Sequence, residues 1–198
     1  MRKFLLIVPL LLPLTACSPR DFLNRRLAAD LIAGSEVFTT PLQFWMRTGV
    51  VSNKEYTSPE YLVLQRRGWV TATSAPCPAE LAPPTCWDVN LTPLGVDAFH
   101  DLVKNGDAGK QAFTVPVARR ELIAVNGISK NDNLADVEFT WQWVATSEVG
   151  SALIAGNLQY KSTVGFKRYD DGWRVLDAQG AKTGQTLEDA LKAAVPTT

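Results

Sequence analysis

The sequence predicts an α+β fold: N-terminal helices with a disulfide-stapled β-hairpin, then a curved antiparallel sheet of about four strands and a C-terminal helix. Three observations lead to this prediction. In the first half, a serine or threonine followed by proline recurs, which is typical of helix starts. In the second half, apolar and polar residues alternate with a period of two, as in half-buried strands. Between two apolar runs stands Asp171-Gly172, a strong hairpin signal.

The N-terminal segment has the organisation of an export signal. Met1-Arg2-Lys3 is a cationic head, and residues 4–14 form an uncharged apolar run. A spanning helix needs about 20 apolar residues, so this run is too short to cross a membrane and matches the core of a signal peptide. We therefore expect residues 1–16 to be a signal peptide.

The segment ends in Leu14-Thr15-Ala16-Cys17, which resembles the lipobox of bacterial lipoproteins. The resemblance implies cleavage before Cys17 and a covalent lipid on its thiol, with no other cofactor expected. Two or three acyl chains would anchor the protein stably to the cell membrane or outer membrane, on the periplasmic side. Ser18 favours the outer membrane. The alternative is an ordinary secretory signal cut after Ala16, which leaves Cys17 as an incidental thiol.

Charge and composition exclude one class of partner. Without residues 1–16 the chain has 182 residues, with 18 basic and 20 acidic side chains. No domain-scale basic field exists, so we expect no nucleic-acid partner. Six tryptophans and an ordinary apolar content predict a packed core.

Helix and strand signals alternate in the first half. Ser18-Pro19 opens a predicted helix that Gly34 ends. The apolar, β-rich run Val37–Arg47 predicts a strand, and Ser58-Pro59 starts a second helix that stops at Gly68. Two strands follow, Trp69–Thr73 and Trp87–Leu91, and Thr92 caps a further helix over 93–103.

Cys77 and Cys86 bracket the connection between those two strands. An even pair of cysteines outside the cytoplasm most simply forms a disulfide with itself, which would contribute about 2–3 kcal/mol by closing so short a loop. A metal site would need more ligands, and the chain has a single histidine, His100. We therefore favour a disulfide and expect no metal.

Residues 58–103, with Leu91-Thr92-Pro93-Leu94-Gly95 at the end of the hairpin, resemble the wing of a winged-helix module. A version that reads DNA would need a basic recognition helix and a cytoplasmic address, and both are missing. The resemblance therefore implies a scaffold.

Residues 105–110, small, polar and glycine-rich, form the best linker candidate. We expect a region 17–104 and a second region 111–198.

Long strands dominate the second region. The expected strands are Val115–Val125, Ala135–Val144, Thr163–Tyr169 and Trp173–Leu176, with a short helix or loop at 147–158 and a last helix Leu187–Val195 capped by Thr186. The closing hairpin, Gly165 to Val175, resembles that of cystatin-like or NTF2-like α+β folds. Those folds usually place a long helix before the sheet, and here only residues 93–103 could supply it.

The sequence shows no recognised catalytic or metal-binding motif, so we predict no catalytic residue. A serine–histidine relay would have to use His100, for which no partner is evident. Phe139, Trp141, Trp143 and Trp173 either line an apolar pocket or pack one face of the sheet, and the pattern leaves both open.

Two functions are compatible with these observations. The favoured one is a non-catalytic envelope accessory or binding module, anchored to the membrane by its lipid and presenting its sheet to an envelope protein or a small apolar ligand. The alternative is a periplasmic hydrolase or lipid-handling enzyme with a site near His100. Replacing His100 would discriminate between them, because only the enzyme needs that side chain.

Overall fold

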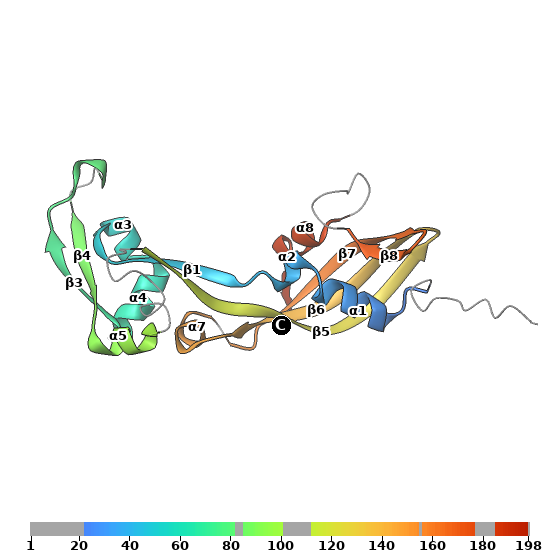
Figure 1. Ribbon diagram of the computed structural model, residues 1–198, viewed down its shortest axis with the longest axis horizontal. Helices are drawn as coiled ribbons and strands as arrows, with labels where there is room; N and C mark the ends of the chain where they lie inside the picture. The colour runs from blue at the N-terminus through green and yellow to red at the C-terminus, as the bar shows by residue number, and fades with distance from the viewer. Residues whose placement is uncertain (1–21, 82–84, 101–111, 155, 177–184, 198) are drawn as a thin grey trace, which may run out of the picture.

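A strand of 20 residues, β5 (Ala112–Asn131), runs through both halves of an elongated molecule (Figure 1). The computed structural model describes residues 22–81, 85–100, 112–154, 156–176 and 185–197. Strand β5 belongs to a six-stranded antiparallel sheet with the order β1-β5-β6-β7-β8, in which β9 pairs with β7. A second, three-stranded antiparallel sheet has the order β2-β4-β3.

The remaining elements of the described residues have the following bounds. The helices are α1 (Arg25–Ala33), α2 (Glu36–Thr39), α3 (Asn53–Tyr56), α4 (Pro59–Arg66), the 3-10 helix η1 (Ala79–Leu81), α5 (Pro93–Ala98), α7 (Glu148–Leu153) and α8 (Leu187–Lys192). The strands are β1 (Leu42–Arg47), β2 (Gly49–Ser52), β3 (Val70–Ala75), β4 (Cys86–Leu91), β6 (Leu134–Ala145), β7 (Gln159–Tyr169), β8 (Gly172–Val175) and β9 (Val195–Thr197).

Helices α1, α2 and α8 pack on strands β5 to β8, and we call this part the helix-covered half (Figure 1). Its core joins Leu23 and Ile32 at the N-terminal end of the described chain to Val137, Phe139 and other sheet residues. Burying apolar surface of both layers is the main source of stability here, at about 25 cal/mol per Å².

The opposite end of the molecule is the stapled lobe, formed by β2, β3, β4, α3, α4 and α5 (Figure 1). A separate core fills it, built around Tyr61, Leu64 and Val89, and the far end of β5 adds Val115 and Val117. Strand β5 therefore carries residues of both cores.

Two irregularities interrupt the pairing of β5 with β6. The register shifts at Ile123 and again at Asn126, so each of these residues is an extra residue opposite a continuous β6. The Asn126 carbonyl accepts a hydrogen bond from the Arg25 Nη2 of α1 (2.9 Å), and the Asn126 side chain donates to Thr140 Oγ1 (2.8 Å). The bulge at Asn126 thus connects the sheet to helix α1.

The predicted α+β class, stapled hairpin, antiparallel sheet and C-terminal helix are confirmed. The sheet has six strands because β1, from the first half of the sequence, pairs with β5, and because the short β9 pairs with β7. The predicted turn at Asp171-Gly172 joins β7 to β8, and Gly172 has the positive φ (125°) that such a turn requires.

Two local predictions were wrong. Val37–Arg47 is not one strand, because Ser35 caps a helical turn by accepting from the Phe38 N–H (3.2 Å), and the strand begins only at Leu42. The first helix begins at Arg25, with Asn24 as its cap, so Phe22 and Leu23 precede it. The proposed start at Ser18-Pro19 lies outside the described residues, as do residues 105–110, so the division into two regions remains a prediction.

Candidate functional site

Strand pairing brings aromatic and cationic side chains together where β5, β6 and β7 cross the middle of the sheet. Arg120 on β5 lies opposite Trp143 on β6, and Tyr160 on β7 lies opposite Trp141. Because side chains alternate along a strand, Trp141 and Trp143 point to the same face. That face is the one that the helices cover.

The three aromatic rings form a continuous wall. The rings of Trp141 and Tyr160 are stacked, with centroids 4.7 Å apart and planes at 21°. The ring of Trp143 meets that of Trp141 edge to face, at 5.4 Å and 83°. Both arrangements are the ones that the charge distribution of aromatic rings favours.

The Arg120 guanidinium lies over this wall. Its Cζ is 4.4 Å from the centroid of the Trp143 ring and 5.7 Å from that of Trp141, so it makes cation–π contacts with both. Its Nη1 donates to the carbonyls of Val37 (3.0 Å), Phe38 (3.4 Å) and Thr40 (3.0 Å) at the end of α2. A helix end leaves such carbonyls without partners, so Arg120 caps α2 as well as covering the aromatic wall.

Burial leaves Arg120 short of both hydrogen bonds and counter-charge. Its Nε is buried and makes no hydrogen bond, and no hydrogen bond of Nη2 occurs in the described part of the chain. The four ion pairs among the described residues do not include Arg120. Burial alone lowers the pKa of this guanidinium below its usual value.

A buried hydroxyl fixes the orientation of Trp141. The indole Nε1 donates to Ser162 Oγ (3.0 Å) on β7, and that hydroxyl donates to the Ala190 carbonyl (2.9 Å) of α8. The one N–H donor of the Trp141 indole is therefore used, and the Ser162 hydroxyl connects the sheet to α8.

A hollow of about 520 Å³ lies between the aromatic wall and the helices. The strands contribute Arg120, Trp141, Trp143 and Tyr160, while α2, α8 and the residues after them contribute the opposite side: Val37, Thr40, Glu188, Leu191, Lys192 and Ala194. We call this space the Arg120 hollow.

The two charged residues on its helical side neutralise each other. Lys192 Nζ lies 2.6 Å from Glu188 Oε1, one turn away on α8. The hydrogen bond to Glu188 raises the pKa of Lys192. Among the lining residues that the structure describes, Arg120 therefore supplies the uncompensated charge of the hollow.

The four aromatic residues that the sequence assigns either to a pocket or to packing all belong to the core of the helix-covered half: Phe139, Trp141 and Trp173 are buried, at 0%, 2% and 7% exposure, and Trp143 packs against them. Trp141 and Trp143 also line the Arg120 hollow. The buried Trp173 Nε1 has no hydrogen-bond partner among the residues that the structure describes.

His100 lies at a second hollow, of about 590 Å³, on the stapled-lobe side of the molecule. Asp97 from α5 and Ser147 from the start of α7 also line it. The Ser147 Oγ accepts from the Gly150 N–H (3.0 Å) as the cap of α7. The His100 side chain is exposed.

The predicted disulfide is present: Cys77 and Cys86 are bonded and join the start of β4 to the chain after β3, with Cα atoms 5.1 Å apart. The predicted lipidation site Cys17 lies outside the described residues.

Among the residues that the structure describes, no three histidine, cysteine or acidic side chains form a group able to hold a metal ion. In the same residues, no helix is long and apolar enough to cross a membrane.

Sequence reasoning missed Arg120. The sequence signal was weak: Arg119 and Arg120 are adjacent in a strand, and one of two neighbouring residues must point to the covered face. Which of the two does so depends on the pairing of β5 with β6, and that pairing is known only from the structure.

Comparison of the chain with protein-family models, with curated proteins and with solved structures finds no match.

Proposed function

We propose that the chain is a lipoprotein anchored to a bacterial membrane outside the cytoplasm, where it works as a non-catalytic binding module of the cell envelope. The observation that carries the proposal is the N-terminal sequence, with its cationic head, its short apolar run and Leu14-Thr15-Ala16-Cys17. The Cys77–Cys86 disulfide agrees with it, because disulfides persist in oxidising compartments.

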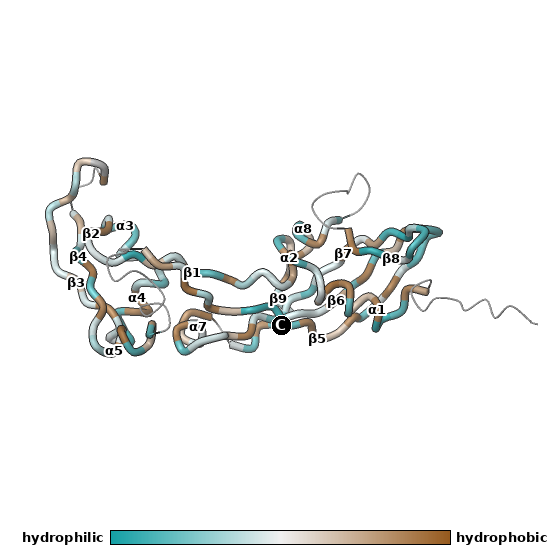
Figure 2. The backbone as a smooth tube through the Cα atoms, viewed as in Figure 1, coloured by the Kyte–Doolittle hydropathy of each residue, from teal (hydrophilic) through white to brown (hydrophobic). Residues whose placement is uncertain are grey.

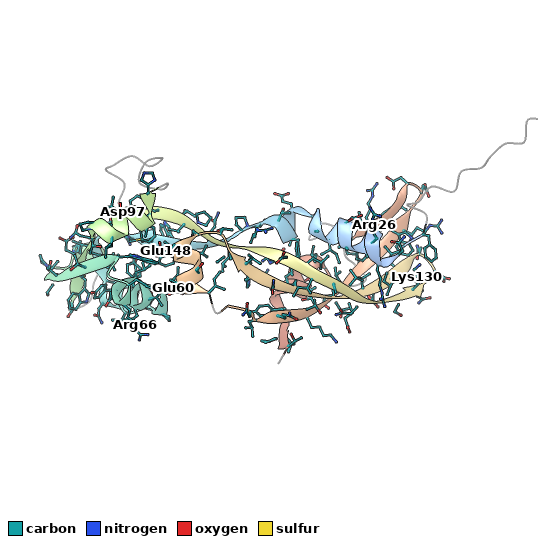
Figure 3. The ribbon with its side chains drawn as sticks, turned by 90° about the horizontal axis from the view of Figure 1, so that it is seen from below. Arg26, Glu60, Arg66, Asp97, Lys130 and Glu148 are labelled. Atoms are coloured by element: carbon teal, nitrogen blue, oxygen red, sulfur yellow. A yellow bond between two sulfur atoms is a disulfide. The ribbon has the colours of Figure 1, made fainter. Side chains whose placement is uncertain are left out.

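The shape of the molecule supports an orientation relative to the membrane. Phe22, the first described residue, contacts Lys130 near the end of β5, with 3.7 Å from Nζ to the ring centre. Arg26 and Lys130 lie at the same end of the molecule, the one nearest Phe22, whereas Asp97 and Arg66 lie at the opposite end (Figure 3). The turns at this end are hydrophilic (Figure 2). Five residues span at most about 18 Å, so a lipid on Cys17 would hold this end close to the bilayer.

In this orientation the stapled lobe is the part that reaches furthest from the membrane. Helices α2 and α8, whose residues line the Arg120 hollow, lie between the two ends (Figure 1). The hollow is the feature that best supports a binding function, because it combines an aromatic wall with a few polar groups, as ligand sites do.

The anchor is tested by replacing Cys17 with alanine. The variant should remain as uncleaved precursor and should lack the acyl mass on its N-terminal peptide, measured by mass spectrometry of the membrane fraction. Ser18→Ala, one residue further along, is the matched control and should be processed and acylated. Normal cleavage and membrane retention of Cys17→Ala would contradict the proposal.

The second hollow supports a second candidate, a periplasmic hydrolase or lipid-handling enzyme at His100. Asp97, His100 and Ser147 line the same space, which brings together the residue types of a serine–histidine relay. Loss of envelope function in both His100→Ala and Ser147→Ala, with the fold intact, would favour the enzyme. Unchanged function would favour the binding module.

A further inference from the structure

We propose that the Arg120 hollow binds a small organic monoanion, a carboxylate carried by an apolar or aromatic body, with the Arg120 guanidinium as its counter-ion. This inference deepens the proposed binding function by naming the ligand class and the residue that selects it.

The structural role of Arg120 does not account for its charge. Capping α2 needs only hydrogen-bond donors, and a neutral side chain can supply them. A partly buried cation is expensive unless it is paired, and cation–π contacts with Trp141 and Trp143 offset only part of that cost. No carboxylate of the described chain forms an ion pair with it. An anion from outside would complete the site.

The nitrogens of Arg120 show how a ligand would be held. Nη1 is occupied by the carbonyls of α2, and Nε is enclosed by protein atoms. Arg120 lines the hollow, and Nη2 makes no hydrogen bond to the described residues, so we expect this nitrogen to donate to a ligand. Carboxylate oxygens are preferred acceptors for guanidinium groups, and a hydrogen bond between two charged groups is about twice as strong as one between neutral groups.

The charges of the lining residues select a monoanion. Glu188 and Lys192 neutralise each other at 2.6 Å, so the described lining carries a net charge of one, that of Arg120. A second negative charge on the ligand would meet the carboxylate of Glu188 instead of a cation. Binding of a dianion is therefore disfavoured.

The walls select an apolar body. One side offers the rings of Trp141 and Trp143, and the other offers Val37, Leu191 and Ala194. A volume of about 520 Å³ falls in the range of small-molecule sites, about 300–1,000 Å³. A flat or short-chain apolar group would lie between the aromatic and the aliphatic wall while its carboxylate reaches Nη2.

The experiment compares two probes that share the same fluorophenyl body and chain length and differ in the head group, a charged carboxylate or a neutral hydroxyl. The full chain, purified in a nonionic detergent, is titrated with 3-(4-fluorophenyl)propanoate and with 3-(4-fluorophenyl)propan-1-ol, and binding is followed by fluorine NMR of the probe. We expect the propanoate to bind with a dissociation constant at least about tenfold lower than that of the alcohol, the usual effect of a hydrogen bond to a charged group. Similar binding of both probes, or no binding of the propanoate at millimolar concentration, would overturn the inference.

Variants identify the residue responsible. Arg120→Gln should remove the preference for the propanoate, whereas Arg119→Gln, the same change at the exposed neighbour on β5, should keep it. A preference that persists in folded Arg120→Gln would contradict the assignment.

Arg120→Gln weakens the cap on α2, so a second variant guards against misfolding. Glu188→Gln, on the surface of α8, should bind the propanoate at least about twofold more tightly, because it removes the negative charge of the hollow. Unchanged or weaker binding in that variant would also count against the site.

These results are separable from the test of the anchor. Acylation of Cys17 is read from the mass of the N-terminal peptide, and it does not involve the hollow. A protein that is acylated but indifferent to the charge of the probe would retain the anchor and lose the ligand site.

Discussion

The helix-covered half and the stapled lobe share strand β5, but different interactions hold each of them together. In the helix-covered half, helices from both ends of the described chain, α1 and α8, cover one sheet face, so its core is assembled from residues far apart in sequence. In the stapled lobe, residues 46–99 supply most of the core, and a covalent bond closes the hairpin. The lobe therefore depends on contacts between residues close in sequence and on a cross-link, whereas the other half depends on the packing of helices far apart in the described chain.

Removing a large side chain from each core tests whether the two cores unfold together. Phe139→Ala should lower the free energy of unfolding by about 3–5 kcal/mol, and Leu64→Ala by about 2–5 kcal/mol, because both side chains are fully buried. Differential scanning calorimetry should show a single transition for both variants, since β5 carries residues of both cores. Two separate transitions would show that the halves unfold independently.

Breaking the disulfide should affect the two halves unequally. Cys77→Ala should lower stability by about 2–3 kcal/mol, because the bond closes a loop between residues nine positions apart. Hydrogen exchange should accelerate in β3 and β4, which the cross-linked connection joins, more than in β6, which belongs to the other sheet. Equal acceleration in all three strands would contradict a local role for the cross-link.

One buried hydroxyl in each half offers a finer comparison. Ser162 joins Trp141 to α8, and Tyr61 both accepts from the Arg47 N–H and donates to the Arg47 carbonyl, each at 2.7 Å. Ser162→Ala and Tyr61→Phe should each cost about 1–3 kcal/mol, because each leaves buried polar partners unpaired. Urea unfolding measures both. Only Ser162→Ala should also weaken binding in the Arg120 hollow, because it releases Trp141.

Alkaline pH should destabilise the stapled lobe through Tyr61. Burial raises the pKa of Tyr61 from 10.0 to about 12. The unfolded chain therefore releases this proton first, and stability falls as the pH rises from about 10 to about 12. Tyr61→Phe should lose this part of the pH dependence, measured by urea unfolding between pH 9 and 12. An unchanged slope in the variant would assign the effect to other groups.

The smallest effect is expected at His100. Its side chain is exposed, so His100→Ala should change the free energy of unfolding by less than about 0.5 kcal/mol, measured by urea unfolding. A binding module anchored by Cys17 should keep its envelope function in this variant. Loss of function without loss of stability would favour the enzyme.

Sequence patterns that involve only neighbouring residues predicted much of the fold. The alternation from Val137 to Trp143 predicted β6, and Asp171-Gly172 predicted the turn after β7, because both depend on neighbouring residues. The cysteine pair was predictable because the compartment expected from the N-terminal sequence and the even number of remaining cysteines left few alternatives. The Val37–Arg47 run misled because the cap at Ser35 outweighs the β propensity of Val37 and Phe38.

The sequence by itself therefore determined the α+β class, the hairpin and its cross-link, and an N-terminus with the pattern of a lipid-anchored protein. Only the tertiary structure decided that Trp141 and Trp143, besides packing in the core, border a hollow, and that Phe139 and Trp173 do not line it. It also decided that Arg120, and not Arg119, lies over the aromatic wall. The physical reason is that these contacts depend on strand register, on bulges at Ile123 and Asn126 and on the docking of α2 and α8, and each of these joins residues far apart in sequence.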